Sequence, residues 1–150
     1  MTVDASIVIK WFVAEPLSLE SRLLLARHME FQAPDLLVPE FANTIWKKVN
    51  RGEIVDPQPF LNELRNLFEL IALYPAEVLI ERASHLAFEM DHPVYDCLYL
   101  ACAEISGTAL VTADKRLAAR ADESLSGLEV RHIGTPETVR WIKDATAASG

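Results

Sequence analysis

Hydrophobic residues recur along the chain with helical spacing in some stretches and form short unbroken runs in others. The helical spacing predicts helices at residues 17–29, 35–50, 57–70, 76–90, 93–107 and 136–146, with Asp35 as the cap of the second. The short runs predict strands that end at Asp4 and lie at residues 31–34, 108–112 and 128–133. The run 71–74 is interpreted as a connection between two helices. Alternating strands and helices favour an α/β fold with a mostly parallel sheet flanked by helices on both faces.

The predicted helix at 93–107 is the most hydrophobic, because Asp96 and Glu104 are the only charged residues between Val94 and Ile105. A helix that is apolar nearly all round lies inside a protein. An ionised Asp96 would therefore cost several kcal/mol unless something compensates its charge. Two explanations remain open for this residue, stabilisation by the helix dipole or a bound metal ion.

Other acidic residues fall at comparable points of the predicted fold. Asp4 and Asp114 follow predicted strands, whereas Glu40 and Asp96 lie near the starts of helices. In a parallel sheet these points share one edge, which is where open α/β sheets bind ligands. Asp4 alone could equally be a helix cap. Carboxylates in contact would repel by about 4 kcal/mol per pair at an effective dielectric constant of about 20, and a divalent cation would offset this. An all-oxygen site favours Mg²⁺ or Mn²⁺.

Composition limits the classes of function. The 150 residues, 51% of them hydrophobic, suit one domain over residues 1–150, with a frayed tail from about 144 to 150. With 22 acidic and 14 basic residues the formal net charge is -8, which does not suit a protein that coats nucleic acid. An enzyme that handles nucleic acid through a metal and a local basic rim remains possible.

Cysteine and histidine usage points to a reducing compartment and away from zinc. Cys97 and Cys102 lie about 140° apart around the predicted helix, so they cannot pair with each other, and we expect a cytoplasmic protein. The 4 histidines show no ligand spacing. The sequence shows no signal peptide and no apolar run long enough to span a membrane.

Four motifs, in this order, resemble those of PIN domains, and most closely those of VapC-type toxins. They are Asp-Ala-Ser at 4–6, Pro-Glu-Phe-Ala-Asn at 39–43, Tyr-Asp-Cys-Leu-Tyr-Leu-Ala at 95–101 and Leu-Val-Thr-Ala-Asp-Lys-Arg-Leu at 110–117. The resemblance covers essentially the whole chain. It implies a PIN-like, Rossmann-like three-layer α/β/α fold. The chain departs from the family in the short apolar run that precedes its first Asp.

The resemblance also implies an activity, a magnesium-dependent endoribonuclease that leaves a 5′-phosphate and a 3′-hydroxyl. The family's catalytic and metal-binding acids carry onto four residues, here called the acidic quartet: Asp4, Glu40, Asp96 and Asp114. The polar residues that support them carry onto Ser6, Asn43 and Thr112. Family members are usually homodimers held inactive by a cognate VapB-type antitoxin.

Basic and aromatic residues near the motifs suggest contacts with RNA and with the antitoxin. Lys10, Lys47, Lys48, Lys115, Arg116 and Arg120 are candidates for binding phosphates, although a solvated charged face explains each one equally well. Trp11, Phe12 and Trp46 lie close in sequence to the acidic quartet. We expect an antitoxin segment to pack on these aromatic residues and to place an Arg among the carboxylates.

Three other functions fit the sequence less well. A receiver domain that accepts a phosphoryl group would place its Thr and Lys on successive strands, whereas Thr112 and Lys115 belong to one strand and turn. A haloacid-dehalogenase-type phosphatase needs an Asp where Ser6 stands. A catalytically inactive PIN fold that only binds a partner would not need all four acids of the quartet.

Overall fold

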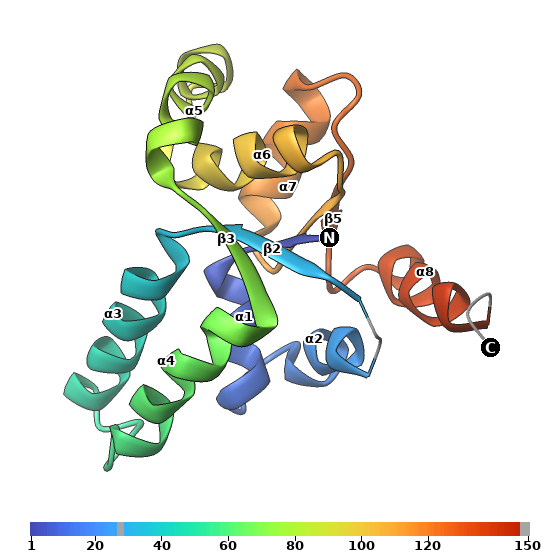
Figure 1. The fold of residues 1–150 in the computed structure, drawn as a ribbon. Helices are drawn as coiled ribbons and strands as arrows, with labels where there is room; N and C mark the ends of the chain where they lie inside the picture. The colour runs from blue at the N-terminus through green and yellow to red at the C-terminus, as the bar shows by residue number, and fades with distance from the viewer. Residues whose placement is uncertain (27–28, 148–150) are drawn as a thin grey trace.

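The computed structural model describes residues 1–26 and 29–147, with side chains described as far as Asp144. Within this part of the chain, five strands form one parallel sheet in the order β3-β2-β1-β4-β5 (Figure 1). The strands are β1 (Thr2–Val3), β2 (Phe31–Pro34), β3 (Ile71–Tyr74), β4 (Leu110–Thr112) and β5 (Val130–His132). The chain order reverses between β1 and β4, which makes the crevice beyond their carboxyl ends the expected ligand site. The receiver fold has the order 2-1-3-4-5, so this sheet excludes that alternative.

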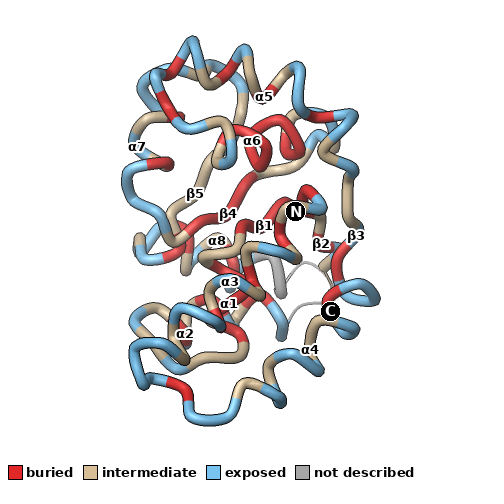
Figure 2. Tube along the Cα trace, turned by 90° about the vertical axis from the view of Figure 1, so that its left-hand side faces the viewer, coloured by how far each residue is buried: buried red, intermediate tan, exposed pale blue. Residues whose placement is uncertain are grey.

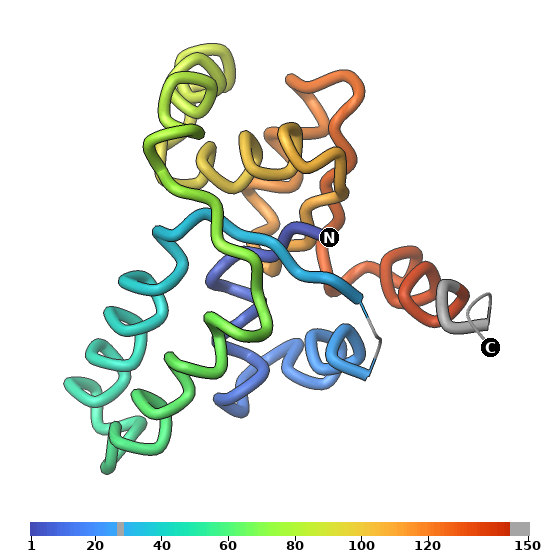
Figure 3. The backbone as a smooth tube through the Cα atoms, in the orientation of Figure 1, coloured from blue at the N-terminus to red at the C-terminus, as the bar shows by residue number. Residues whose placement is uncertain are grey.

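Helices cover both faces of the sheet and complete the predicted three-layer α/β/α fold (Figures 1 and 3). One layer contains α1 (Ala5–Phe12), α2 (Ser18–Leu25), α3 (Leu37–Asn50) and α4 (Gln58–Leu70). The other contains α5 (Ala76–Met90), α6 (Val94–Ser106) and α7 (Lys115–Ser124). The last helix, α8 (Pro136–Ala147), packs against α2. None of the described helices is long and apolar enough to cross a membrane.

Helix α6 forms the centre of the core, as its sequence predicted. Its residues 97–103 are all buried, and Figure 2 shows α6 in the buried colour together with β1 and β4. Gly107 ends the helix in the left-handed conformation, with φ of 63°, which glycine adopts without the steric cost of a Cβ. Cys97 and Cys102 of this helix are both free and buried.

The segment 71–74 is a strand and not the connection that was expected. It forms β3, which pairs with β2 over four residues from Phe31–Ile71 to Pro34–Tyr74. Only Ile71 of this strand is buried, because β3 lies at the edge of the sheet. A four-residue edge strand is too short for its alternation to be recognised against two flanking helices.

Two helix starts also differ from the prediction. Asp35 does not cap α3, because Oδ1 of Asp35 instead accepts a hydrogen bond of 3.0 Å from the N–H of Ala76 at the start of α5. The predicted helix 17–29 is observed as the shorter α2, since Leu17 adopts a left-handed conformation with φ of 69° and Leu25 is the last helical residue. Residues 27–28 of that prediction lie outside the described part of the chain.

The C-terminal helix is close to its predicted limits. Ile142 is buried and Trp141 is half-buried beneath the guanidinium of Arg131, 4.4 Å from its ring centroid. The backbone is helical as far as Ala147, and residues 148–150 of the expected tail lie outside the described residues.

Candidate metal centre

The four carboxylates of the acidic quartet line one pocket of about 150 Å³. It lies at the carboxyl ends of β1 and β4, where the order of the sheet reverses. Ala5, Ser6, Tyr99 and Leu117 complete its wall. Because one water in the liquid occupies about 30 Å³, the pocket has room for a cation with a few water molecules.

Asp4 is the most deeply buried of the four and is held on both carboxylate oxygens. It caps α1, since Oδ1 accepts from Ile7 N at 3.0 Å and from Ser6 Oγ at 2.6 Å. Its Oδ2 accepts from the hydroxyl of Thr112 on β4. The pKa of Asp4 is raised to about 6, mainly because the carboxyl group is buried. The charge of Asp114 adds to this rise, and the hydrogen bonds partly oppose it. Asp4 therefore acts as a helix cap and also faces the pocket.

Ser6 and Thr112, the two predicted supporting hydroxyls, connect Asp4 to the start of α7. Ser6 Oγ accepts from Ala113 N at 2.9 Å, and Thr112 Oγ1 accepts from Asp114 N at 2.9 Å. These bonds fix the backbone that follows β4 relative to Asp4.

Asp114 caps α7. Its Oδ1 accepts from the N–H groups of Arg116 at 2.8 Å and Leu117 at 3.1 Å. One oxygen of Asp114 is therefore committed to the helix.

Glu40 and Asp96 are each held by a hydrogen-bond partner that the sequence reasoning did not identify. Tyr99 Oη donates to Glu40 Oε2 at 2.5 Å, and His92 Nε2 lies 2.8 Å from Asp96 Oδ2. Burial raises the pKa of Glu40 despite the Tyr99 hydrogen bond, and the charge of Asp96 adds to that rise. For His92 a signal was available, because it precedes Asp96 by only four residues. The contact between Tyr99 and Glu40 joins residues 59 positions apart and has no local signal.

The donor set suits a hard divalent cation. In the described part of the chain the second oxygens, Glu40 Oε1, Asp96 Oδ1 and Asp114 Oδ2, accept no hydrogen bond. Carboxylate oxygens of this kind are the ligands that Mg²⁺ and Mn²⁺ prefer.

The four carboxylates line one pocket, but they do not yet surround a single ion-binding position. No three His, Cys, Asp or Glu side chains of the described residues are already arranged to hold a metal ion. Burial is the main cause of the raised pKa values of Asp4 and Glu40, and the charges of Asp114 and Asp96 add to them. A bound cation would have to draw the carboxylates together, and it would replace their repulsion with attraction.

The predicted phosphate-binding residues divide into two groups. Lys10 is an unsuitable candidate, because its side chain is only 12% exposed and pairs with Glu15 at 2.5 Å. Lys48 joins the same cluster through Glu15 at 2.9 Å and Glu53 at 2.8 Å. Ion pairing thus explains these two lysines without RNA.

The other basic residues remain accessible around the pocket. Lys47 is exposed on α3 and its charge partly lowers the pKa of Glu40. Lys115 and Arg116 are exposed directly after Asp114. Asn43 is exposed one turn after Glu40 but does not line the pocket.

Of the three aromatic residues expected at an antitoxin interface, Trp11 belongs to the core. Its Nε1 donates to Ser21 O at 3.1 Å, and its ring lies 5.1 Å from that of Phe31. Phe12 packs edge-on against Phe41 at 5.5 Å and is half-buried. Trp46 remains available, because 59% of its surface is exposed.

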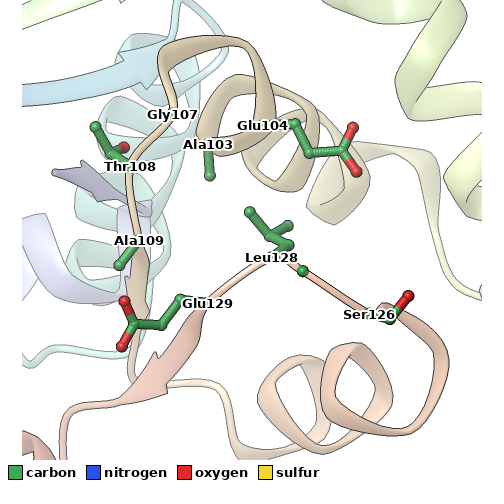
Figure 4. A pocket seen from close by; sticks show the side chains of 9 residues that line it. Ala103, Glu104, Gly107, Thr108, Ala109, Ser126, Leu128 and Glu129 are labelled. Carbon is green, nitrogen blue, oxygen red and sulfur yellow. The ribbon is translucent and has the colours of Figure 1, made fainter.

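A wider hollow of about 450 Å³ lies at the opposite edge of the sheet, before β4 and β5 (Figure 4). Its two carboxylates are already paired. Glu104 accepts from Arg82 through bonds of 2.7 and 2.9 Å, and Glu129 pairs with Arg131. This hollow therefore offers no uncompensated acidic group for a cation.

Comparison with known proteins agrees with this fold. Residues 1–123 match the PIN domain family. The chain is 31% identical over 120 residues to ribonuclease VapC3 of Pyrobaculum aerophilum. This match covers 79% of this chain and 92% of that protein. The fold resembles that of PAE2754 from P. aerophilum, with a TM-score of 0.65, 20% identity, and 97% and 88% of the two chains covered. It also resembles a toxin–antitoxin complex from Klebsiella pneumoniae, with a TM-score of 0.55, 19% identity, and 85% and 98% covered.

Proposed function

Because this chain belongs to the PIN-domain family and is of its VapC type, we propose that it is a divalent-cation-dependent endoribonuclease, the toxin of a toxin–antitoxin pair. The observation that carries the proposal is the convergence of the acidic quartet on one pocket at the reversal point of the sheet. The ribonuclease relative supports RNA as the substrate. An inactive binding module would have no use for four mutually repelling carboxylates.

In this mechanism Asp4, Asp96 and Asp114 would hold the cation. A bound Mg²⁺ or Mn²⁺ would polarise the phosphodiester and lower the pKa of a coordinated water. Asp4 is fixed by the hydroxyls of Ser6 and Thr112, so its carboxylate needs little reorganisation when the substrate arrives.

We assign Glu40 as the general base that takes a proton from the attacking water. Tyr99 fixes one of its oxygens, and the other accepts no hydrogen bond in the described part of the chain. Its raised pKa brings it closer to the neutral range in which a general base works well. Lys47, Lys115 and Arg116 are exposed beside the quartet and would bind RNA phosphates.

The proposed partners are a cognate antitoxin and a second copy of the chain in a homodimer. The structural likeness to a chain of a toxin–antitoxin complex supports the first. We assign to the antitoxin an Arg or Lys that enters the anionic pocket, since positive charge would relieve the same repulsion as a cation.

RNA cleavage by the purified protein tests the proposal. We expect wild-type protein to cleave single-stranded RNA with Mg²⁺ or Mn²⁺ and to lose this activity in EDTA. Asp96→Asn removes one ligand charge and should lower the cleavage rate at least about a hundredfold while the protein stays folded.

Asp122→Asn is the matched control, because it makes the same change on exposed α7, outside the pocket. It should cleave as the wild type does. Cleavage by Asp96→Asn at the wild-type rate, or cleavage that persists in EDTA, would contradict the proposed function.

A further inference from the structure

The three-residue connection between α5 and α6 holds His92 in a fixed place. Asp91 ends α5 in the left-handed conformation, with φ of 49°, and the N–H of His92 donates to Ala87 O at 3.0 Å. Pro93 follows in extended conformation, with φ of -56°, and leads directly into α6. A left-handed residue on one side and a proline on the other leave the His92 backbone little freedom.

The imidazole of His92 points from this connection to the first turn of α6. Its side chain is only 2% exposed, and Nε2 lies 2.8 Å from Oδ2 of Asp96, a carboxylate that lines the pocket. The side chain of Asp96 is itself 36% exposed, so the buried imidazole holds the inner oxygen of a carboxylate that reaches solvent.

The second ring nitrogen fixes where the proton lies. Nδ1 of His92 is buried and has no hydrogen-bond partner among the described residues. A proton on Nδ1 would be an N–H group buried without an acceptor, which is costly. The proton therefore lies on Nε2, and His92 donates it to Asp96 Oδ2.

We propose that His92 is a positioning residue that holds Asp96 Oδ2 and so turns Oδ1 of the same carboxylate towards a cation in the pocket. This inference rests on the proposed function, since it requires that a cation binds there. Removing a residue that orients a metal ligand by a hydrogen bond, without touching the metal itself, weakens metal affinity by about ten- to a hundredfold. A histidine that only fills space in the core would leave metal affinity unchanged.

Two substitutions separate the two roles. His92→Phe keeps an aromatic ring of similar size and removes the donor. His92→Gln keeps an N–H at about the reach of Nε2. Titration with Mn²⁺ alone, without RNA, should show affinity about ten- to a hundredfold weaker for His92→Phe and largely restored for His92→Gln. With RNA at saturating Mn²⁺ the KM should not change, because His92 does not contact substrate.

A spectroscopic measurement on the wild type does not depend on whether a variant folds. Long-range ¹H–¹⁵N spectra of the metal-free protein at neutral pH should show the His92 proton on Nε2 and none on Nδ1. His85, which is exposed on α5, gives a comparison signal from the same sample.

Each outcome decides the inference separately from the proposed function. A proton on Nδ1, wild-type Mn²⁺ affinity in folded His92→Phe, or weak affinity in both variants would overturn the positioning role even if the protein cleaves RNA. Weakened Mn²⁺ binding in His92→Phe with rescue by His92→Gln would support it even if no RNA is cleaved. Failure of the wild type to bind Mn²⁺ would overturn it, whereas the cleavage assay tests the nuclease activity independently.

Discussion

At the scale of single residues, the feature that most constrains this protein is the buried carboxyl group of Asp4. Three donors from Ser6, Ile7 and Thr112 hold it, yet burial still raises its pKa to about 6 from an ordinary value of 3.8. The metal-free fold therefore favours the protonated form more than the unfolded chain does. Ionising Asp4 in the metal-free fold therefore carries an electrostatic cost, which a bound cation would offset.

The raised pKa of Asp4 predicts how the stability of the protein depends on pH when EDTA keeps it free of metal. Since the folded pKa is the higher one, the stabilisation from Asp4 is complete below pH 4 and is lost as the pH rises through about 6. A shift of this size corresponds to about 2 to 3 kcal/mol. In Asp4→Asn the fall in the free energy of unfolding between pH 4 and 8 should shrink by that amount, as measured by urea unfolding.

The exposed Asp122→Asn should keep the wild-type pH dependence. An unchanged dependence in Asp4→Asn would contradict this, because it would show that folding does not raise the pKa of Asp4.

Sequence reasoning predicted which acids lie together at the pocket, but not the hydrogen bonds that hold them. The four acids could be anticipated because parallel strands bring their carboxyl ends to one edge. The bonds from Thr112 to Asp4 and from Tyr99 to Glu40 join residues 108 and 59 positions apart. Such contacts depend on how helices from both layers approach the sheet, which a single sequence does not specify.

At the scale of elements, α6 determines both the core and the position of Asp96. Leu100 in the middle of α6 is fully buried, whereas Ile105 near its end is 53% exposed. Leu100→Ala should lower the free energy of unfolding by about 2 to 5 kcal/mol, because it leaves a cavity. Ile105→Ala removes a side chain of similar size and should cost under about 1 kcal/mol. Equal losses in the two variants by chemical unfolding would contradict the central position of α6.

Elements with long, consistent patterns were predicted to within a few residues, as α5 and α6 illustrate. The errors fall where a tertiary contact replaces a local one. Asp35 binds the N–H of Ala76 instead of capping α3, and residues 71–74 pair with β2 as an edge strand. Neither contact has a signal within its own segment.

At the scale of the whole molecule, exposed apolar side chains distinguish where a partner would bind. Sequence proximity to the acids could not separate Trp11 from Trp46, because only the packing of α1 against α2 shows that Trp11 is inside. Trp46 belongs to the helical layer opposite the one that carries α5 (Figure 1). Trp is also one of the residue types enriched among those that carry most of the binding energy at protein interfaces.

The proposed antitoxin interface therefore predicts a difference between two exposed aromatic residues. Trp46→Ala should weaken antitoxin binding by about 2 kcal/mol or more if Trp46 is an interface anchor. Phe88→Ala, on α5 and 88% exposed, should leave it unchanged. Titration of each variant with the antitoxin measures both. Weaker binding by Phe88→Ala alone would place the interface on the other layer.

We propose above all that the acidic quartet binds one or more divalent cations in the pocket at the carboxyl ends of β1 and β4. Anomalous diffraction from crystals grown with Mn²⁺ tests it directly, because the signal locates the ion. We expect a peak within about 2.0 to 2.5 Å of oxygens from Asp4, Asp96 and Asp114, with Glu40 close by. A peak only outside the pocket, or none at a Mn²⁺ concentration that supports RNA cleavage, would contradict it.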